Sequence, residues 1–365
     1  MTNRRQFLKT CAALAASLPA APVLAIDNNY QAAVDKIWRP KNTPSPNALK
    51  RTTEWVRMAT LAASSHNTQP WKFKLQGNSI IITPDYQRRC PAVDPDDSHL
   101  FKSLGCAAEN FMQAAAADGF NADAQFDLQQ DAVVINFEST TTNLNNLSAA
   151  IINRRCSRTP YDGKPITALA QASLITAATS KDIKPIILQS PQKLETMLEY
   201  VRQGNLAQFD DPAFVNELRD WVRFNPTDAI AKSDGLAGEV SGQPSIPGWL
   251  GRAGFSLFLT GNKQADIDAK AIRSSAGIIA FVGDYDDKAN WVAAGRAYQR
   301  FALQATAFNV RNAFINQPIE VRRLRPQLHD WLDVPKQHVH LIVRYGNGPI
   351  TPHSLRRPIE QVIVT

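Results

Sequence analysis

Cysteine and histidine are scarce in this sequence, and neither forms a recognisable metal or disulfide pattern. Four cysteines occur in 365 residues, one of them within the first 25. The other three, Cys90, Cys106 and Cys156, are odd in number and match no metal motif, so we interpret them as buried or incidental thiols. A Cys90–Cys156 bridge remains an alternative in an oxidising compartment. His338 and His340 could share one side of a strand, but no third ligand accompanies them, so no metal site is expected.

The chain also lacks long runs of like charge. Its net charge is +7, and Arg4, Arg5 and Lys9 supply three of the positive charges within the first 25 residues. Subtracting three from seven leaves +4 for the other 340 of the 365 residues. An excess this small and dispersed argues against nucleic-acid binding. A chain of this length can hold one large core or two linked half-domains.

The first 25 residues have the pattern of an export signal. Arg4-Arg5 and Phe7-Leu8-Lys9 precede an apolar run from Cys11 to Leu18, and the segment ends in Val23-Leu24-Ala25. This order is typical of a twin-arginine signal rather than of a basic start to a core helix, and the apolar run is too short to span a bilayer. We therefore expect cleavage after Ala25, export by the twin-arginine machinery, a periplasmic location and no stable membrane span.

Residues 26–146 combine helical and strand patterns. A proline-containing arm over residues 26–46 precedes a predicted hairpin within residues 71–83. Apolar residues at helical spacing then predict a helix that Asp97-Ser98 caps and that stops at Gly119, and alternating runs within 125–137 predict two more strands. The pattern is that of a mixed α+β unit.

Polar residues 138–146 are the best candidate for a linker, and residues 147–365 beyond them are again mixed. The apolar run 277–282 predicts a central strand, and a long helix is predicted to begin after Asp286-Asp287. Residues 225–262 are rich in glycine and proline and carry several aromatic residues. Two interpretations stay open for them, a mobile lid over a flat ligand and an extended arm that wraps the fold.

A polar octapeptide, Ser64–Trp71, marks the first candidate site. It lies where a helical pattern stops and a strand pattern starts, and it is rich in hydroxyl and amide side chains. At such a junction, side chains and free backbone N–H groups can point together at a ligand. A loop of polar residues at a helix end is the alternative.

The second candidate site is the segment 153–162, where Arg154, Arg155 and Arg158 lie within five residues. Guanidinium groups this close repel one another unless an anion or solvent neutralises them, and arginine binds phosphate with paired donors. A solvated basic loop is the alternative interpretation.

These motifs together resemble the nitroreductase family of FMN-dependent oxidoreductases. Ser64–Trp71 is similar to the family's flavin-contacting loop, with Ala63 in place of a proline, and Arg154 to Arg158 resembles its phosphate-binding motif, with Cys156 in place of a serine. The closing segment 355–362 and the loop 314–318 resemble its last phosphate contact and the loop near flavin N5. The resemblance implies that FMN is bound by Ser64, Ser65, Asn67, Gln69, Arg154, Arg155, Arg158, Asn316, Gln317 and Arg356.

The order of the motifs implies an internal pseudo-dimer. In single-domain members of the family the arginine motif comes first, and each flavin lies between two subunits. Here the serine loop precedes the arginines, so we expect residues 26–146 and 147–365 to be two nitroreductase-like half-units of one chain. This arrangement resembles the Acg-like branch of the family.

The function implied is that of an FMN-dependent oxidoreductase, which reduces a small nitroaromatic or quinone acceptor through flavin N5. The resemblance implies no catalytic side chain. NAD(P)H is one candidate donor, although the periplasm is not expected to contain it, so another donor stays open. The alternatives are a protein that stores or sequesters FMN without turnover, and a binding module for some other anion.

Overall fold

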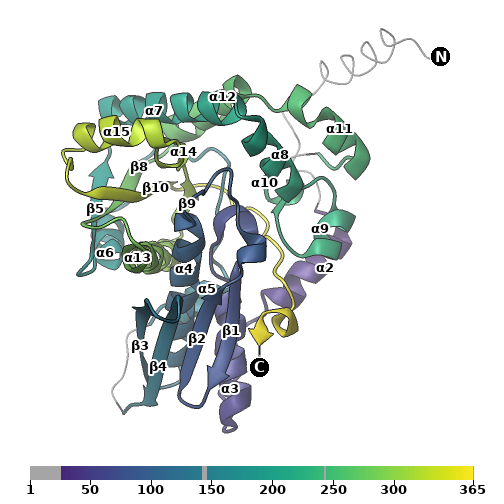
Figure 1. The fold of residues 1–365 in the computed structure, drawn as a ribbon, viewed down its shortest axis with the longest axis vertical. Coiled ribbons are helices and arrows are strands. Elements are labelled where there is room, and N and C mark those ends of the chain that lie inside the picture. The colour runs from purple at the N-terminus through teal and green to yellow at the C-terminus, as the bar shows by residue number, and fades with distance from the viewer. Residues whose placement is uncertain (1–25, 142–145, 242–243, 365) are drawn as a thin grey trace.

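The computed structural model describes residues 26–141, 146–241 and 244–364 (Figure 1). The predicted export signal, residues 1–25, lies outside the described residues, and so does part of the predicted linker. Within these three ranges, no helix is both long and apolar enough to cross a membrane.

The first half of the chain forms a unit of helices and one antiparallel sheet. Its elements are α3 (Ala48–Thr60), β1 (Trp71–Gln76), β2 (Ser79–Pro84), α4 (Ser98–Ala116), β3 (Phe120–Asp127) and β4 (Ala132–Ser139). The strands lie in the order β1-β2-β4-β3, and each neighbouring pair is antiparallel. Trp71, Phe73, Ile80 and Ile82 are buried at alternate positions, so one face of the predicted hairpin packs on the core.

The second half repeats this topology. Its corresponding elements are α6 (Ala168–Ala178), β5 (Ile183–Leu188), β8 (Gly277–Gly283), α13 (Lys288–Ala307), β9 (Arg311–Phe314) and β10 (His338–Gly346). The strands lie in the order β5-β8-β10-β9, again antiparallel throughout. Both units therefore place the first, second, fourth and third strands side by side, with a long helix between the second and third. The predicted α+β fold with two half-units is confirmed, while the division at residue 146 stays a prediction.

The long helices α4 and α13 join the two units by a reciprocal close approach. A Cβ atom built on Gly105 would lie 2.1 Å from the carbonyl oxygen of Val292, and one built on Gly295 would lie 1.9 Å from that of Lys102. Each glycine thus meets the backbone three residues before the other glycine. This exchange of equivalent contacts is what a two-fold relation between the units requires.

Several helices are inserted between β5 and β8. They are α7 (Pro191–Phe209), α8 (Pro212–Trp221), α9 (Pro226–Lys232), α10 (Gly238–Ser241), α11 (Gly248–Phe258) and α12 (Gly261–Arg273), with the short strands β6 (Val222–Arg223) and β7 (Leu236–Ala237). The expectation of an extended arm over residues 225–262 is therefore wrong. Several of its prolines and glycines lie at the ends of short helices, as Pro226 does at the start of α9.

The remaining elements are short. They are α5 (Ser148–Ile151), α14 (Gln317–Glu320), α15 (Arg325–Trp331) and the 3₁₀ turns η1 (Ser65–Asn67), η2 (Tyr86–Arg88), η3 (Arg322–Leu324) and η4 (Ile359–Gln361).

The N-terminal arm and the C-terminal tail both pack against the first half of the chain. The arm over residues 26–46 contains a helix, α2 (Asn28–Ile37), which the sequence analysis did not predict. Tyr30, Val34 and Trp38 recur every four residues and are buried. The C-terminal strand β11 (Ile363–Val364) pairs in parallel with β1, so the tail of the second half completes the sheet of the first (Figure 1).

Candidate functional site

The serine loop between α3 and β1 has an unusual backbone that its surroundings hold in place. His66, Asn67 and Gln69 have positive φ angles of 46°, 54° and 54°. Residues other than glycine adopt such angles only where neighbouring structure stabilises them. The Gln69 amide donates to Ser233 O at 2.9 Å, and the Asn67 amide donates to Gly235 O and to Leu355 O at 3.1 Å each. The loop is therefore fastened to elements of the other half of the chain.

The three arginines of the second motif differ in how many of their N–H donors form hydrogen bonds within the protein. Arg154 is buried, with 3% of its surface exposed, and its Nη2 donates to Leu61 O at 3.1 Å while its buried Nε has no partner. Arg155 donates to Thr351 O at 2.6 Å and to Asn153 O at 3.2 Å. Arg158 is exposed and makes no hydrogen bond or ion pair with the described residues. Several donors in this segment are thus free for a ligand.

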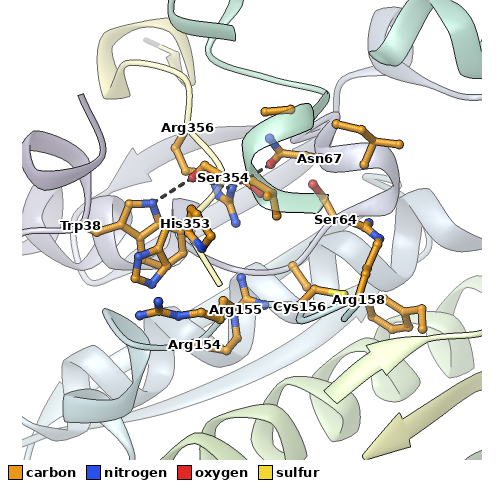
Figure 2. A pocket seen from close by; sticks show the side chains of 16 residues that line it. Trp38, Ser64, Asn67, Arg154, Arg155, Cys156, Arg158, His353, Ser354 and Arg356 are labelled. Atoms are coloured by element: carbon orange, nitrogen blue, oxygen red, sulfur yellow. Dashed lines mark hydrogen bonds between the residues drawn. The ribbon is translucent and has the colours of Figure 1, made fainter. Parts of the chain in front are cut away.

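A pocket brings the two motifs together (Figure 2). Its empty space, part of it open to solvent, is about 580 Å³. Its polar wall is formed by side chains from both halves of the chain, namely Ser64, Asn67, Arg154, Arg155, Cys156, Arg158, His353, Ser354 and Arg356. Four arginines line it and no aspartate or glutamate does. This composition favours an anionic ligand.

The arginines repel one another in the absence of a ligand. Burial, followed by the positive charges of Arg311 and Arg154, lowers the pKa of Arg155 to about 10. Burial and the charge of Arg154 lower the pKa of Arg356 to about 9. Because a bound anion would offset both the burial and the repulsion, the site is prepared for negative charge.

Arg356 lies in the pocket wall, but its donors are engaged with the protein. It donates to the carbonyl oxygens of Thr60, Leu61 and Ala62 at 3.0–3.4 Å, and to Asn67 Oδ1 at 2.8 Å. These carbonyls end helix α3, where a positive charge is favourable. The structure therefore shows Arg356 anchoring the serine loop, and its contact with the phosphate stays a prediction.

Four of the predicted residues do not reach the pocket. The backbone N–H of Ser65 donates to Ser103 Oγ, and the Gln69 side chain is buried under the loop that it holds. Asn316 accepts from the backbone N–H of Ile342 at 2.9 Å, and Gln317 donates to Asp268 at 3.0 Å. None of the four lines the pocket, and their predicted contact with FMN stays a prediction.

Several lining residues were missed by the sequence analysis. Phe314, at the end of β9, provides an aromatic wall, and Leu236, Ala237 and Val240 provide aliphatic cover from the glycine- and proline-rich segment. That segment therefore lines the pocket, while one of its aromatic residues, Trp249, is 72% exposed. Isolated aliphatic residues in a loop-like stretch carry no periodic signal, so only the structure identifies them.

A second, smaller cavity contains the remaining histidines. His338 and His340 stack with ring centroids 6.5 Å apart, and His329 lies 6.0 Å from His338. Lys102 and Arg325 line the same cavity. Among the residues that the structure describes, no cluster of three histidine, cysteine or carboxylate ligands could hold a metal ion.

Comparison with known proteins gives relatives along nearly the whole chain. No family model matches the sequence. Two Mycobacterium tuberculosis proteins, both provisionally named NAD(P)H nitroreductase, are 26% and 23% identical to it. The matches cover 88% and 84% of this chain and 93% of each relative. The similarity to these provisionally named nitroreductases thus extends over most of this chain. The second relative also carries the name acg, in agreement with the resemblance seen in the sequence.

Solved structures overlap the fold only partially. An FMN-bound nitroreductase of Bacteroides fragilis is 16% identical, with 56% of this chain and 90% of that chain aligned at a TM-score of 0.34. A nitroreductase of Anabaena variabilis is 12% identical, with 74% and 69% aligned at a TM-score of 0.40. Overlaps of this extent position no residue of the site.

Proposed function

We propose that this protein is an FMN-dependent oxidoreductase of the nitroreductase family. The observation that carries the proposal is the pocket in which four arginines and no carboxylate face Ser64 and Asn67 across the junction of the two halves. The similarity to proteins named NAD(P)H nitroreductase, which extends over 88% of the chain, supports it.

The residues present fit a flavin mononucleotide. A phosphate monoester needs several donors without a competing carboxylate, and the orphaned Nε of Arg154 and the unpaired Arg158 provide them. Ser64 and Asn67 supply hydroxyl and amide groups, and Phe314, Leu236 and Val240 supply apolar surface for a flat ring.

The protein's own contribution is to bind FMN, to orient it and to shield it from water. Bound FMN would supply hydride transfer at N5, from a donor and then to a small nitroaromatic or quinone acceptor. The arginines with free donors hold the phosphate end, the serine loop fixes the ring end, and the aliphatic residues that line the pocket exclude water. No side chain of this chain is proposed as a general acid or base.

Export before function completes the proposal. A chain that is exported folded takes up its cofactor in the cytoplasm. NAD(P)H is the candidate donor if the protein acts before or without export, and another reductant is needed if it acts in the periplasm.

The visible spectrum of the purified full chain tests this function. We expect flavin absorbance that is released on denaturation as FMN, and bleaching of that absorbance by an added donor without air. Retained FMN that resists NADH, NADPH and dithionite-reduced viologen would favour the storage alternative. A colourless protein that does not bind added FMN would contradict the proposed function and favour a site for another anion.

A further inference from the structure

His353 is a buried side chain with an unused hydrogen-bonding atom beside the arginines. It has 9% of its surface exposed, and its Nε2 has no partner. It lines the same pocket as Arg154 and Arg155, and Figure 2 shows these residues next to one another. A buried polar atom without a partner costs free energy, so a native structure that keeps one commonly uses it.

The imidazole of His353 is held in a defined orientation by the N-terminal arm. Its ring stacks on the indole of Trp38, with centroids 4.1 Å apart and planes inclined by 20°. Trp38 is itself fixed, because its Nε1 donates to Ser354 O at 2.9 Å and the Arg356 guanidinium lies 5.0 Å from its ring centroid. Tyr30, in the helix α2 that ends immediately before Trp38, donates its hydroxyl to His353 O at 2.9 Å.

We propose that His353 is a further ligand of the bound anion and donates its Nε2–H to the phosphate of FMN, with Trp38 as its positioning residue. The inference rests on the proposed function. It gives α2 a role that neither the motifs nor the resemblance assigned, because α2 orients a donor of the phosphate site.

The charge state of the free protein suits this role. Burial, and then the positive charges of Arg155, Arg154 and Arg356, lowers the pKa of His353 to about 2. The imidazole is therefore neutral at physiological pH and can donate one hydrogen bond without adding a fifth positive charge to the four arginines. The contact depends on the phosphate and not on the flavin ring, so riboflavin, which lacks phosphate, separates the two.

The test compares the dissociation constants of FMN and riboflavin for the flavin-free full chain, measured by quenching of flavin fluorescence. His353→Leu should raise the FMN constant by roughly tenfold to a hundredfold, as expected for a lost hydrogen bond to a charged group, and should leave the riboflavin constant within about twofold. His353→Gln, which keeps a donor, should recover most of the FMN affinity. His338→Gln, in the second cavity, is the matched control and should change neither constant.

Trp38 is tested by the same ratio. Trp38→Phe keeps a stacking ring and should stay close to the wild type, whereas Trp38→Ala should lose FMN affinity and keep riboflavin affinity. Should His353→Leu fail to fold, nitrogen-15 NMR of the imidazoles, assigned with His353→Gln, replaces it. FMN should then shift the His353 Nε2 resonance of the wild type, and riboflavin should not.

Each remaining outcome counts against the inference. Equal losses of FMN and riboflavin affinity in His353→Leu would show a structural role only, and unchanged FMN affinity would show no contact. In both cases the wild type still binds FMN, so the proposed function survives. A wild type that binds neither flavin would overturn the proposed function and, with it, this role of His353.

Discussion

The arginines of the pocket show how the same residue type serves different ends. Arg356 donates hydrogen bonds to the carbonyl oxygens at the end of α3. Arg154 donates one hydrogen bond to Leu61 O, and its Nε has no partner. Arg158 has no partner among the described residues. A guanidinium whose donors are already satisfied within the protein adds positive charge to a pocket but little directional bonding. Ligand affinity should therefore be concentrated in the arginines with free donors.

Arg158→Gln tests this at the residue scale. We expect FMN binding to weaken by about 1.5–3 kcal/mol, because one charge-assisted contact is lost. The melting temperature without FMN should not change, since Arg158 makes no hydrogen bond or ion pair with the residues that the structure describes. Arg202→Gln is the matched control: this exposed arginine forms only a 3.9 Å surface pair with Glu199 and should leave FMN binding unchanged. Equal affinity in wild type and Arg158→Gln, measured by titration calorimetry, would contradict the assignment.

At the scale of elements, the crossing of α4 and α13 determines how the halves meet. The helices approach so closely at Gly105 and Gly295 that a methyl group on either would overlap backbone atoms of the other helix. Backbone at such a crossing cannot move aside as a side-chain tip can, so the contact tolerates only glycine.

Gly105→Ala and Gly295→Ala should therefore destabilise the protein. We expect each to lower the free energy of unfolding by at least about 1–3 kcal/mol, although alanine favours helices over glycine. Gly261→Ala in α12 is the control, because its nearest contact would lie at 3.1 Å and a smaller loss is expected. Urea denaturation of the flavin-free protein measures all three. A stabilising effect of alanine at residue 105 or 295 would rule out the close crossing.

The elements nearest the site were the hardest to predict. Helix α2 was missed because Pro40, Pro44 and Pro46 suggested an irregular arm, although Tyr30, Val34 and Trp38 have helical spacing. Asp97 was expected to cap α4, yet it adopts a positive φ of 62° and Asp94 instead accepts from the N–H groups of His99 and Leu100. When the capping side chain lies several residues before the helix, its position depends on the path of the loop between them, which the local sequence does not specify.

At the scale of the whole molecule, the two described halves share a topology but differ in charge at the corresponding segments. The segment before α3, equivalent to the arginine segment before α6, carries Arg39 and Lys41. Arg39 pairs with Glu54 at 3.0 Å and Lys41 pairs with Asp118. Because both cations form ion pairs, the segment before α3 does not have the unpaired positive charge of the pocket.

One FMN per chain is the expected stoichiometry. Flavin absorbance of the reconstituted protein, divided by the protein concentration from amino-acid analysis, should approach one. Glu54→Gln, which removes the carboxylate that pairs with Arg39, should not raise it, because the equivalent loop between α6 and β5, residues 179–182, contains one serine and no asparagine and does not repeat the sequence of the first site. A ratio near two flavins per chain would show that the equivalent region of the other half also binds flavin.

The proposed export is also tested on the whole molecule. We expect the mature protein from the native host's periplasm to begin at Ile26 and to carry flavin on arrival. Arg4→Lys with Arg5→Lys should keep it in the cytoplasm, as shown by fractionation and intact mass. Periplasmic protein in that double variant would contradict the twin-arginine route.

The sequence by itself determined the α+β class, the hairpin at 71–83, the long helices and the two polar motifs, because each depends on residues close together in the chain. It also indicated, from the order of those motifs, that two halves would meet. Only the tertiary structure decided which members of the motifs face the pocket, since that depends on where their hydrogen-bond partners lie. Gln69 and Arg356 are occupied by groups that are distant in sequence, and His353 reaches the arginines only because α2 folds against the tail. Contacts between segments three hundred residues apart follow from packing, and no local pattern encodes them.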